Sequence, residues 1–161
     1  MAAALRICLD AAKTVDRRIE VELVELAGLN IPGEAAAGVA LTPGANDDFP
    51  GLAATLAAPT VAGMILGMPV YFGNMSPLCK AFLDRCIVFH KDKLLRNMVA
   101  GVLAVGGAPN GAQELTIRSV QVALALSSPI WTEDNDFFGA GVATWTTDRV
   151  ELFLSAAGQS E

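Results

Sequence analysis

Apolar runs alternate with amphipathic stretches along the chain, and this alternation predicts an α/β fold with a parallel sheet. Residues 61–66 (Val-Ala-Gly-Met-Ile-Leu) and 99–105 (Val-Ala-Gly-Val-Leu-Ala-Val) contain only apolar residues and glycine. Runs of this kind are typical of parallel strands that helices cover on both faces. We therefore expect both segments to be buried strands.

Two of the predicted helices lie in the first part of the chain. Residues 2–15 have one apolar face, as an amphipathic helix requires. Asp47 or Asp48 can cap a short helix that ends before Pro59. The apolar face of the first helix consists of Leu5, Cys8, Leu9 and Ala12.

Two further helices follow the two buried strands. The dipeptide Ser-Pro at 76–77 predicts a helix start, because serine caps a helix and proline suits its first position. The apolar face of this helix continues to Phe89. Asn110 and Gln113 resemble a capping box, which would open a helix through Leu126.

The other segments give weaker or different signals. Residues 19–26 alternate glutamate with Val, Leu and Ile, which predicts a strand with one wet face near a sheet edge. Residues 32–50 are rich in Gly, Ala and Pro and indicate a loop. Residues 130–131 and 141–145 are weak strand candidates, and residues 147–161 fit a helix or a strand equally well.

The composition narrows the class of protein. The 161 residues carry a net charge of −6, and 53% are hydrophobic while 17% are charged. This balance excludes a disordered chain, and the acidic pI of about 4.7 argues against a nucleic-acid partner. We expect one domain spanning residues 1–161.

The cysteines and the hydropathy of the chain indicate the cellular compartment that we expect for it. Three cysteines without paired ligand spacing make a disulfide framework or a metal site improbable on chemical grounds, and Cys79 and Cys86 fit a core as small hydrophobes. Proline and glycine interrupt the apolar segment 52–72, so we expect no membrane span there. No basic region precedes an apolar stretch at the start, and we expect a cytoplasmic protein without a signal peptide.

Two loops carry the candidate chemistry, since ligands of parallel sheets bind beyond the carboxyl ends of the strands. Residues 67–75 and 106–112 both lead from a buried strand to a helix start, where free N–H groups favour electron-rich ligand oxygens. Glycines allow close approach of the backbone, several side chains offer flat or polarizable apolar surface, and others are polar anchors. These groups are Gly73, Gly106, Gly107 and Gly111; Pro69, Tyr71, Phe72 and Met75; and Asn74, Ser76 and Gln113.

A flat heteroaromatic ring with a polar edge suits this set of groups. Neither loop matches a Walker or dinucleotide-binding fingerprint. Two purely structural strand-to-helix turns are the alternative interpretation of the same residues.

The sequence of both loops resembles a known family. Pro69-Val-Tyr-Phe-Gly-Asn-Met-Ser76, followed by residues 80–85, looks like the second flavin-binding loop of flavodoxin-like NAD(P)H-dependent FMN reductases, and is similar to iron–sulfur flavoproteins and related quinone reductases. Residues 106–114 resemble the third flavin-binding loop of the same group. The resemblance runs from about Leu5 to Trp145, and it implies a three-layer flavodoxin-like sandwich.

The resemblance also implies a set of FMN-binding residues. One loop would line the isoalloxazine and ribityl chain, and the other would face the flavin from the next strand. The implied residues are Pro69, Val70, Tyr71, Phe72, Gly73, Asn74, Met75 and Ser76, with Gly106, Gly107, Asn110, Gly111 and Gln113. The flavin itself supplies the redox chemistry, so no catalytic side chain is named.

Two features of the family are not found in this sequence. The family begins with a central strand and a loop that cradles the FMN phosphate, whereas residues 1–5 already belong to the first predicted helix. The cysteine cluster of the iron–sulfur subgroup would lie between Asn30 and Asp48, where the sequence has no cysteine, so we expect no iron–sulfur cluster and no other metal.

The absent first strand leaves a position in the sheet to fill, because an unmade buried hydrogen bond costs about 1–3 kcal/mol. Residues 19–26 and 61–66 would normally flank that strand. We expect one of three arrangements: the two segments pair directly, another chain fills the gap, or the true start lies upstream of Met1.

The functional expectation is an FMN-dependent oxidoreductase that passes electrons from NAD(P)H to a quinone, free flavin or similar small acceptor, as a homo-oligomer (dimer or tetramer). A non-catalytic remnant that acts as an interaction module is the first alternative, and a binding domain for another small molecule is the second. His90, Lys91 and Lys93 are expected to be solvated, with contact to a nicotinamide phosphate as the rival role. Trp131 and Trp145 fit a core or an interface better than a flavin stack.

Overall fold

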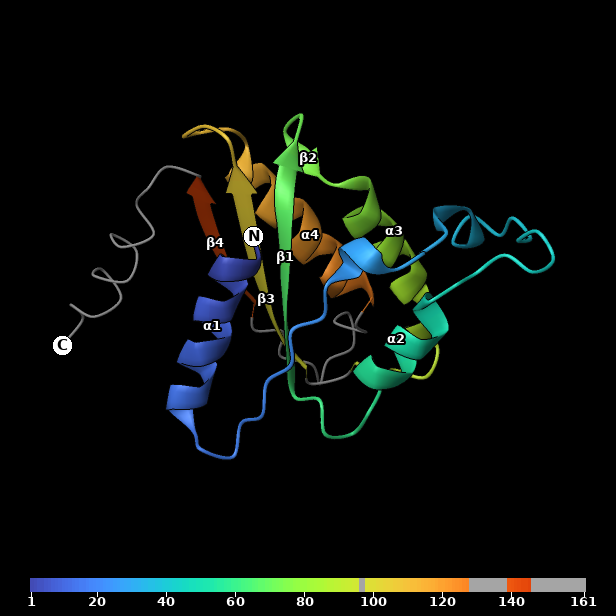
Figure 1. Ribbon diagram of the computed structural model, residues 1–161, viewed down its shortest axis with the longest axis horizontal. Coiled ribbons are helices and arrows are strands. Elements are labelled where there is room, and N and C mark those ends of the chain that lie inside the picture. The colour runs from blue at the N-terminus through green and yellow to red at the C-terminus, as the bar shows by residue number, and fades with distance from the viewer. Residues whose placement is uncertain (96–97, 128–138, 146–161) are drawn as a thin grey trace.

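A pair of parallel strands forms the centre of the sheet (Figure 1). The computed structural model describes residues 1–95, 98–127 and 139–145. Strand β1 (Gly63–Tyr71) pairs in parallel with β3 (Val99–Gly106), and β3 pairs in parallel with β4 (Gly139–Trp145). The short β2 (Asn74–Met75) turns back against the end of β1, which gives the sheet order β2-β1-β3-β4. The predicted α/β fold with a parallel sheet is confirmed.

Helices cover the two faces of the sheet unequally (Figure 1). One face carries α1 (Ala2–Val15), and the other carries α2 (Phe49–Leu56), α3 (Pro77–Arg85) and α4 (Gln113–Ser127). A 3₁₀ turn at Cys86–Phe89 continues α3. All four predicted helices are therefore present.

The main core lies under the three helices, and the period of two along the strands explains its composition. Alternate residues of β1 and β3 point into it, namely Leu66, Met68, Ala100, Val102 and Ala104. The helices contribute large side chains to the same core, including Phe49, Phe82, Phe89, Val120 and Leu124. On the opposite face, a β-carbon on Gly67 would lie only 2.8 Å from side-chain atoms of Leu5, so glycine lets α1 pack directly on β1.

The segment predicted as an edge strand, residues 19–26, forms no strand, and this prediction is wrong. The segment has no regular structure until a 3₁₀ turn at Leu26–Gly28. Its alternating pattern is real, but a strand also needs a neighbouring edge that accepts its hydrogen bonds. Ile19 and Val24 are 39% and 41% exposed, so the segment lies at the surface, where water can satisfy its backbone.

Most of one edge of β1 has no strand partner among the described residues. The backbone oxygen of Ala62 faces β3, because it accepts a hydrogen bond from Val99 N (3.0 Å). Backbone N–H and C=O groups of successive residues point to opposite edges of a strand, so those of Gly63, Ile65 and Gly67 point away from β3. Within the described part of the chain, only β2 pairs on that edge, at the last two residues of β1. The expected direct pairing of 19–26 with 61–66 is therefore wrong, while the other two arrangements stay predictions.

Strand β1 continues five residues beyond the predicted end at Leu66, through part of the predicted turn. Pro69 does not break the strand. It lies level with Val105 of β3, but its backbone nitrogen points to the open edge, as that of Gly67 does. Proline is tolerated on such an edge, where its missing N–H removes no ladder bond. No helix in the described ranges is long and apolar enough to cross a membrane.

A partly buried ion pair attaches the long loop before α2 to α3. Arg85 donates to both carboxylate oxygens of Asp47 (3.2 and 2.7 Å) and lies 4.6 Å from the centre of the Phe49 ring. The two side chains are only 11% and 17% exposed. The hydrogen bonds from Arg85 lower the pKa of the Asp47 carboxyl. The predicted loop is thus irregular in backbone but fixed in position.

Replacing Asp47 with asparagine should lower the free energy of unfolding by about 1–3 kcal/mol at neutral pH, because Arg85 loses its charged acceptor. The folded state lowers this pKa, so the stabilisation is present above the pKa of the unfolded chain and is lost as the pH falls through the folded value. Melting temperatures of wild type and D47N should therefore converge as the pH is lowered below about 4.

The matched control is Asp84→Asn, which removes the exposed pair with Lys80. This change should cost less than about 0.5 kcal/mol at any pH. Equal losses of stability in the two variants at neutral pH would show that the Asp47 pair does not hold the loop.

Candidate functional site

The parallel pairing of β1 and β3 places the two predicted loops side by side. Pro69 is level with Val105 in the ladder, so both strands end at the same rim of the sheet (Figure 1). The contact between the loops is close, since a β-carbon on Gly73 would lie 3.5 Å from the β-carbon of Ala112. The structure therefore brings together the two segments that the sequence singled out.

The first loop is a tight β-hairpin. Tyr71 pairs with Asn74, and the two residues between them, Phe72 and Gly73, have φ angles of 49° and 77°. Two consecutive positive φ angles define a type I′ turn, which matches the twist of the flanking strands. The left-handed conformation suits Gly73 but costs a bulky residue such as Phe72 about 1–2 kcal/mol.

The two aromatic side chains of the hairpin face solvent, whereas Val70 and Met75 pack against the core. Phe72 is fully exposed and Tyr71 is 55% exposed, so both rings are available at the rim. The Asn74 Oδ1 accepts a hydrogen bond from Met75 N (2.8 Å), which fixes the side chain. Ser76 caps α3 as predicted, with its Oγ accepting from Cys79 N (3.3 Å).

The second loop is supported from within by Gln113. This side chain is 2% exposed, and its Nε2 donates to Ala108 O (2.6 Å). A β-carbon on Gly106 would lie 2.5 Å from that nitrogen, so the glycine makes room for the amide. Gln113 was expected to be a polar anchor that faces the flavin; the structure buries it beneath the loop.

The predicted capping box at the start of α4 is wrong. The helix begins at Gln113 itself, and Asn110 lies outside it with a φ of 54°. Asn110 is therefore a loop residue at the rim and not the N-cap of α4, and the Gln113 Nε2 donates to Ala108 O. Gly107 borders open space, since a β-carbon there would meet nothing within 4 Å.

Charge is absent from both loops. Residues 69–76 and 106–113 contain no Asp, Glu, Lys, Arg or His. An uncharged rim with backbone amides, an exposed aromatic pair and open space at Gly107 fits a flat, uncharged ring system. These loops fit the ring of a flavin, and they contain no cation for its phosphate.

The other candidate residues lie away from this rim. His90, Lys91 and Lys93 are exposed in the turn that precedes β3, at the opposite end of the sheet (Figure 1). Solvation of the three side chains is thus confirmed. Cys79 and Cys86 are buried, and burial raises the pKa of each thiol to about 12, as for small core residues. Trp131 lies outside the described residues.

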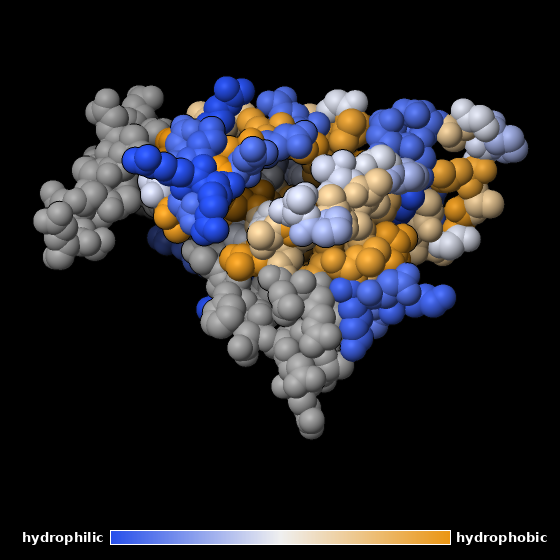
Figure 2. Space-filling view, turned by 90° about the horizontal axis from the view of Figure 1, so that it is seen from below, coloured by the Kyte–Doolittle hydropathy of each residue, from blue (hydrophilic) through white to orange (hydrophobic). Residues whose placement is uncertain are grey.

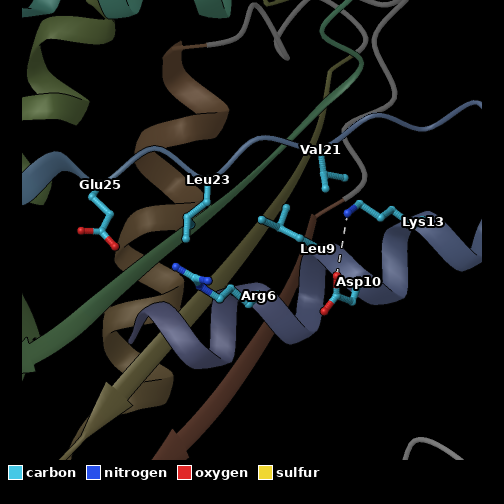
Figure 3. A pocket seen from close by; sticks show the side chains of 7 residues that line it. All are labelled: Arg6, Leu9, Asp10, Lys13, Val21, Leu23 and Glu25. Atoms are coloured by element: carbon cyan, nitrogen blue, oxygen red, sulfur yellow. Dashed lines mark ion pairs between the residues drawn. The ribbon is translucent and has the colours of Figure 1, made fainter.

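Sequence reasoning missed an open hollow on the α1 side of the sheet (Figure 3). The hollow has a volume of about 500 Å³ and lies between α1 and the segment 21–25. Two cations and two carboxylates line it and balance in charge, with Lys13 paired to Asp10 at 3.9 Å. The lining residues are Arg6, Leu9, Asp10, Lys13, Val21, Leu23 and Glu25. The hollow exists because residues 21–25 cross α1 as an irregular segment and not as a strand of the sheet.

Comparison with known proteins identifies the family of the chain. The family model for NADPH-dependent FMN reductases matches residues 2–134. The chain belongs to this family. A shorter match, to a PIN domain, spans residues 116–155, which is a quarter of the chain. It overlaps the end of the first match and extends beyond it.

Curated relatives of this FMN reductase family member are iron–sulfur flavoproteins. One from Methanocaldococcus jannaschii is 42% identical over 84 residues, covering 50% of this chain and 44% of the relative. One from Methanosarcina thermophila is 39% identical over 84 residues, covering 52% and 43%. The matched region thus spans less than half the length of these relatives.

Gly106→Ala tests the packing of the second loop in this FMN reductase family member. The new methyl group displaces the buried Gln113 amide, and we expect a loss of about 1–3 kcal/mol in the free energy of unfolding. Gly107→Ala is the matched control, because its methyl group enters open space and should change stability by less than about 0.5 kcal/mol. Thermal melts that show equal stability for both variants would contradict the assigned role of Gln113.

Proposed function

We propose that the chain binds FMN at the rim formed by residues 69–76 and 106–113 and acts as a flavin-dependent oxidoreductase. The observation that carries this proposal is the contact between two uncharged loops at the carboxyl ends of β1 and β3. Membership of the FMN reductase family supports it. The names of the curated relatives, which are flavoproteins, point the same way.

The chain's own residues would hold and orient the flavin ring. Backbone groups of the hairpin at Gly73 and Asn74 would face its polar edge, and the loop at Gly107 and Asn110 would close the other side. Bound flavin accepts a hydride from a nicotinamide and passes electrons on. With a quinone as acceptor, NAD(P)H, one proton and the quinone would yield NAD(P)⁺ and the hydroquinone.

A non-catalytic module is the second candidate. The open edge of β1 between Gly63 and Pro69 favours it, because an unpaired edge is a common site of protein association. The exposed side chains of Ile87, Val88 and Leu94 near the end of α3 also support the expected homo-oligomer.

Titration of the protein with FMN, followed by visible absorbance and flavin fluorescence, separates the two candidates. Binding at micromolar FMN and bleaching of the flavin by NADPH without oxygen would support the oxidoreductase. A protein that binds no FMN at micromolar excess would favour the non-catalytic module.

Gly107→Phe sharpens this test. A β-carbon on Gly107 meets no atom within 4 Å, so the new side chain would extend into the open space that we assign to the flavin. We expect the dissociation constant for FMN to rise by at least about tenfold, with little change in melting temperature.

Gly28→Phe is the control, since Gly28 also borders open space but lies in the 3₁₀ turn after residue 25. This variant should keep the wild-type affinity for FMN. Equal affinities of G107F and G28F for FMN would show that the second loop is not part of the flavin site.

A further inference from the structure

The open edge of β1 lacks the protection that soluble proteins usually give to the edge of a sheet. Such edges are normally blocked by charged residues, above all lysine, or by proline. Residues 63–71 carry no charge, and Pro69 is the only residue of this strand without a backbone N–H. The edge groups of Gly63, Ile65 and Gly67 have no strand partner among the described residues. They are therefore available to a further strand.

The segment beside this edge has the side-chain pattern of a strand but no partner. Residues 20–25 run beside β1 (Figures 1 and 3). Within the described parts of the chain, no backbone hydrogen bond joins the segment to β1. Val21 and Leu23 are half-buried while Glu22 and Val24 are exposed, which is the period of two of a strand. Only a neighbouring edge is missing.

Helix α1 leaves room on the same side of the sheet. Its apolar face packs on the sheet, but no residue of α1 is buried, in contrast to α2 and α3. The hollow of about 500 Å³ lies between α1 and residues 21–25 (Figure 3). Leu9, Val21 and Leu23 give the hollow apolar walls. This side of the sheet therefore has space for one more apolar element.

We propose that the open edge of β1 accepts an extended apolar segment of a second polypeptide, which residues 20–25 then flank as the outermost strand. One face of that segment would join the core lined by Leu66 and Met68, and the other would face α1. Strands covered on both faces are continuous apolar runs. The uncharged edge and the balanced charges of the hollow also favour a segment without charge.

This inference names the partner of the interaction module considered above, and it holds whether or not the chain binds FMN. A single inserted segment fits better than a second copy that pairs edge to edge through β1. Edge-to-edge pairing would leave residues 20–25 outside the sheet, whereas an inserted segment has one neighbour on each of its edges. About five to seven residues suffice, because β2 already pairs with Val70 and Tyr71 at the end of the edge.

A synthetic peptide tests the inference on the full chain. Its core alternates three valine and three alanine residues, and one lysine and one glutamate at its ends keep it soluble and neutral. Binding should slow amide hydrogen exchange at least about tenfold at Ile65 and Gly67 and in residues 20–25, as measured by NMR. Two control peptides carry N-methyl groups on alternate residues, so that one edge or the other loses its donors. Both controls should lose binding, because the segment uses both edges.

Leu23→Lys and Val24→Lys are a matched pair of variants within residues 20–25. Leu23 lines the hollow, so a charge there should raise the dissociation constant of the peptide about tenfold. Val24 is 41% exposed, and V24K should bind the peptide within about twofold of wild type. Both positions lie in an irregular surface segment, so both variants should keep the wild-type melting temperature.

Unchanged exchange at Ile65 and Gly67 in the presence of the peptide would overturn the inference. Slow exchange at these amides in the protein alone would overturn it too, because the edge would already be filled; protection that falls on dilution would identify a second copy as the occupant. Equal peptide affinities of L23K and V24K would contradict the flanking position of residues 20–25. The FMN titration stays a separate measurement, since a protein without FMN affinity contradicts the oxidoreductase and leaves the peptide result intact.

Discussion

The parallel ladder between β1 and β3 is the interaction on which the candidate site depends. Seven consecutive residue pairs, from Gly63 with Val99 to Pro69 with Val105, hold the two strands in one register. Because the pairing is parallel, both strands end at the same rim, and a shift by one pair would separate the loops that follow them. The contact between Gly73 and Ala112 is a direct consequence of this register.

The hydrophobic pattern predicted the parts of the fold that are covered on both faces. Residues 61–66 and 99–105 are apolar because side chains such as Leu66, Ala100, Val102 and Ala104 lie in the core, and such runs have few alternatives to a buried strand. The same reasoning failed for 19–26, where the pattern describes one wet and one dry face but not a partner edge. A strand is stable only as a member of a ladder, and no local signal shows whether the neighbour is present.

The site residues divide in a similar way. The loops themselves could be located from glycine, helix-start signals and family resemblance, since these depend on local chemistry. The role of Gln113 could not be predicted in this way. The spacing of Asn110 and Gln113 in the sequence is compatible both with a capping box and with a glutamine that lies beneath a loop. Only the tertiary contact with Gly106 and Ala108 distinguishes the two arrangements.

Backbone strain is concentrated at the rim of the sheet. Within the described residues, four non-glycine positions have a positive φ, and three of them, Phe72, Asn110 and Ala112, lie in the two loops. Strained positions persist only where the surrounding structure fixes them, and they concentrate at ligand sites. In this protein the ladder of β1 with β3 and the buried amide of Gln113 provide that fixation. The ladder and the buried amide thus hold the two loops in backbone conformations that are unfavourable for some of their residues. A preformed ligand site requires loops that are fixed in this way.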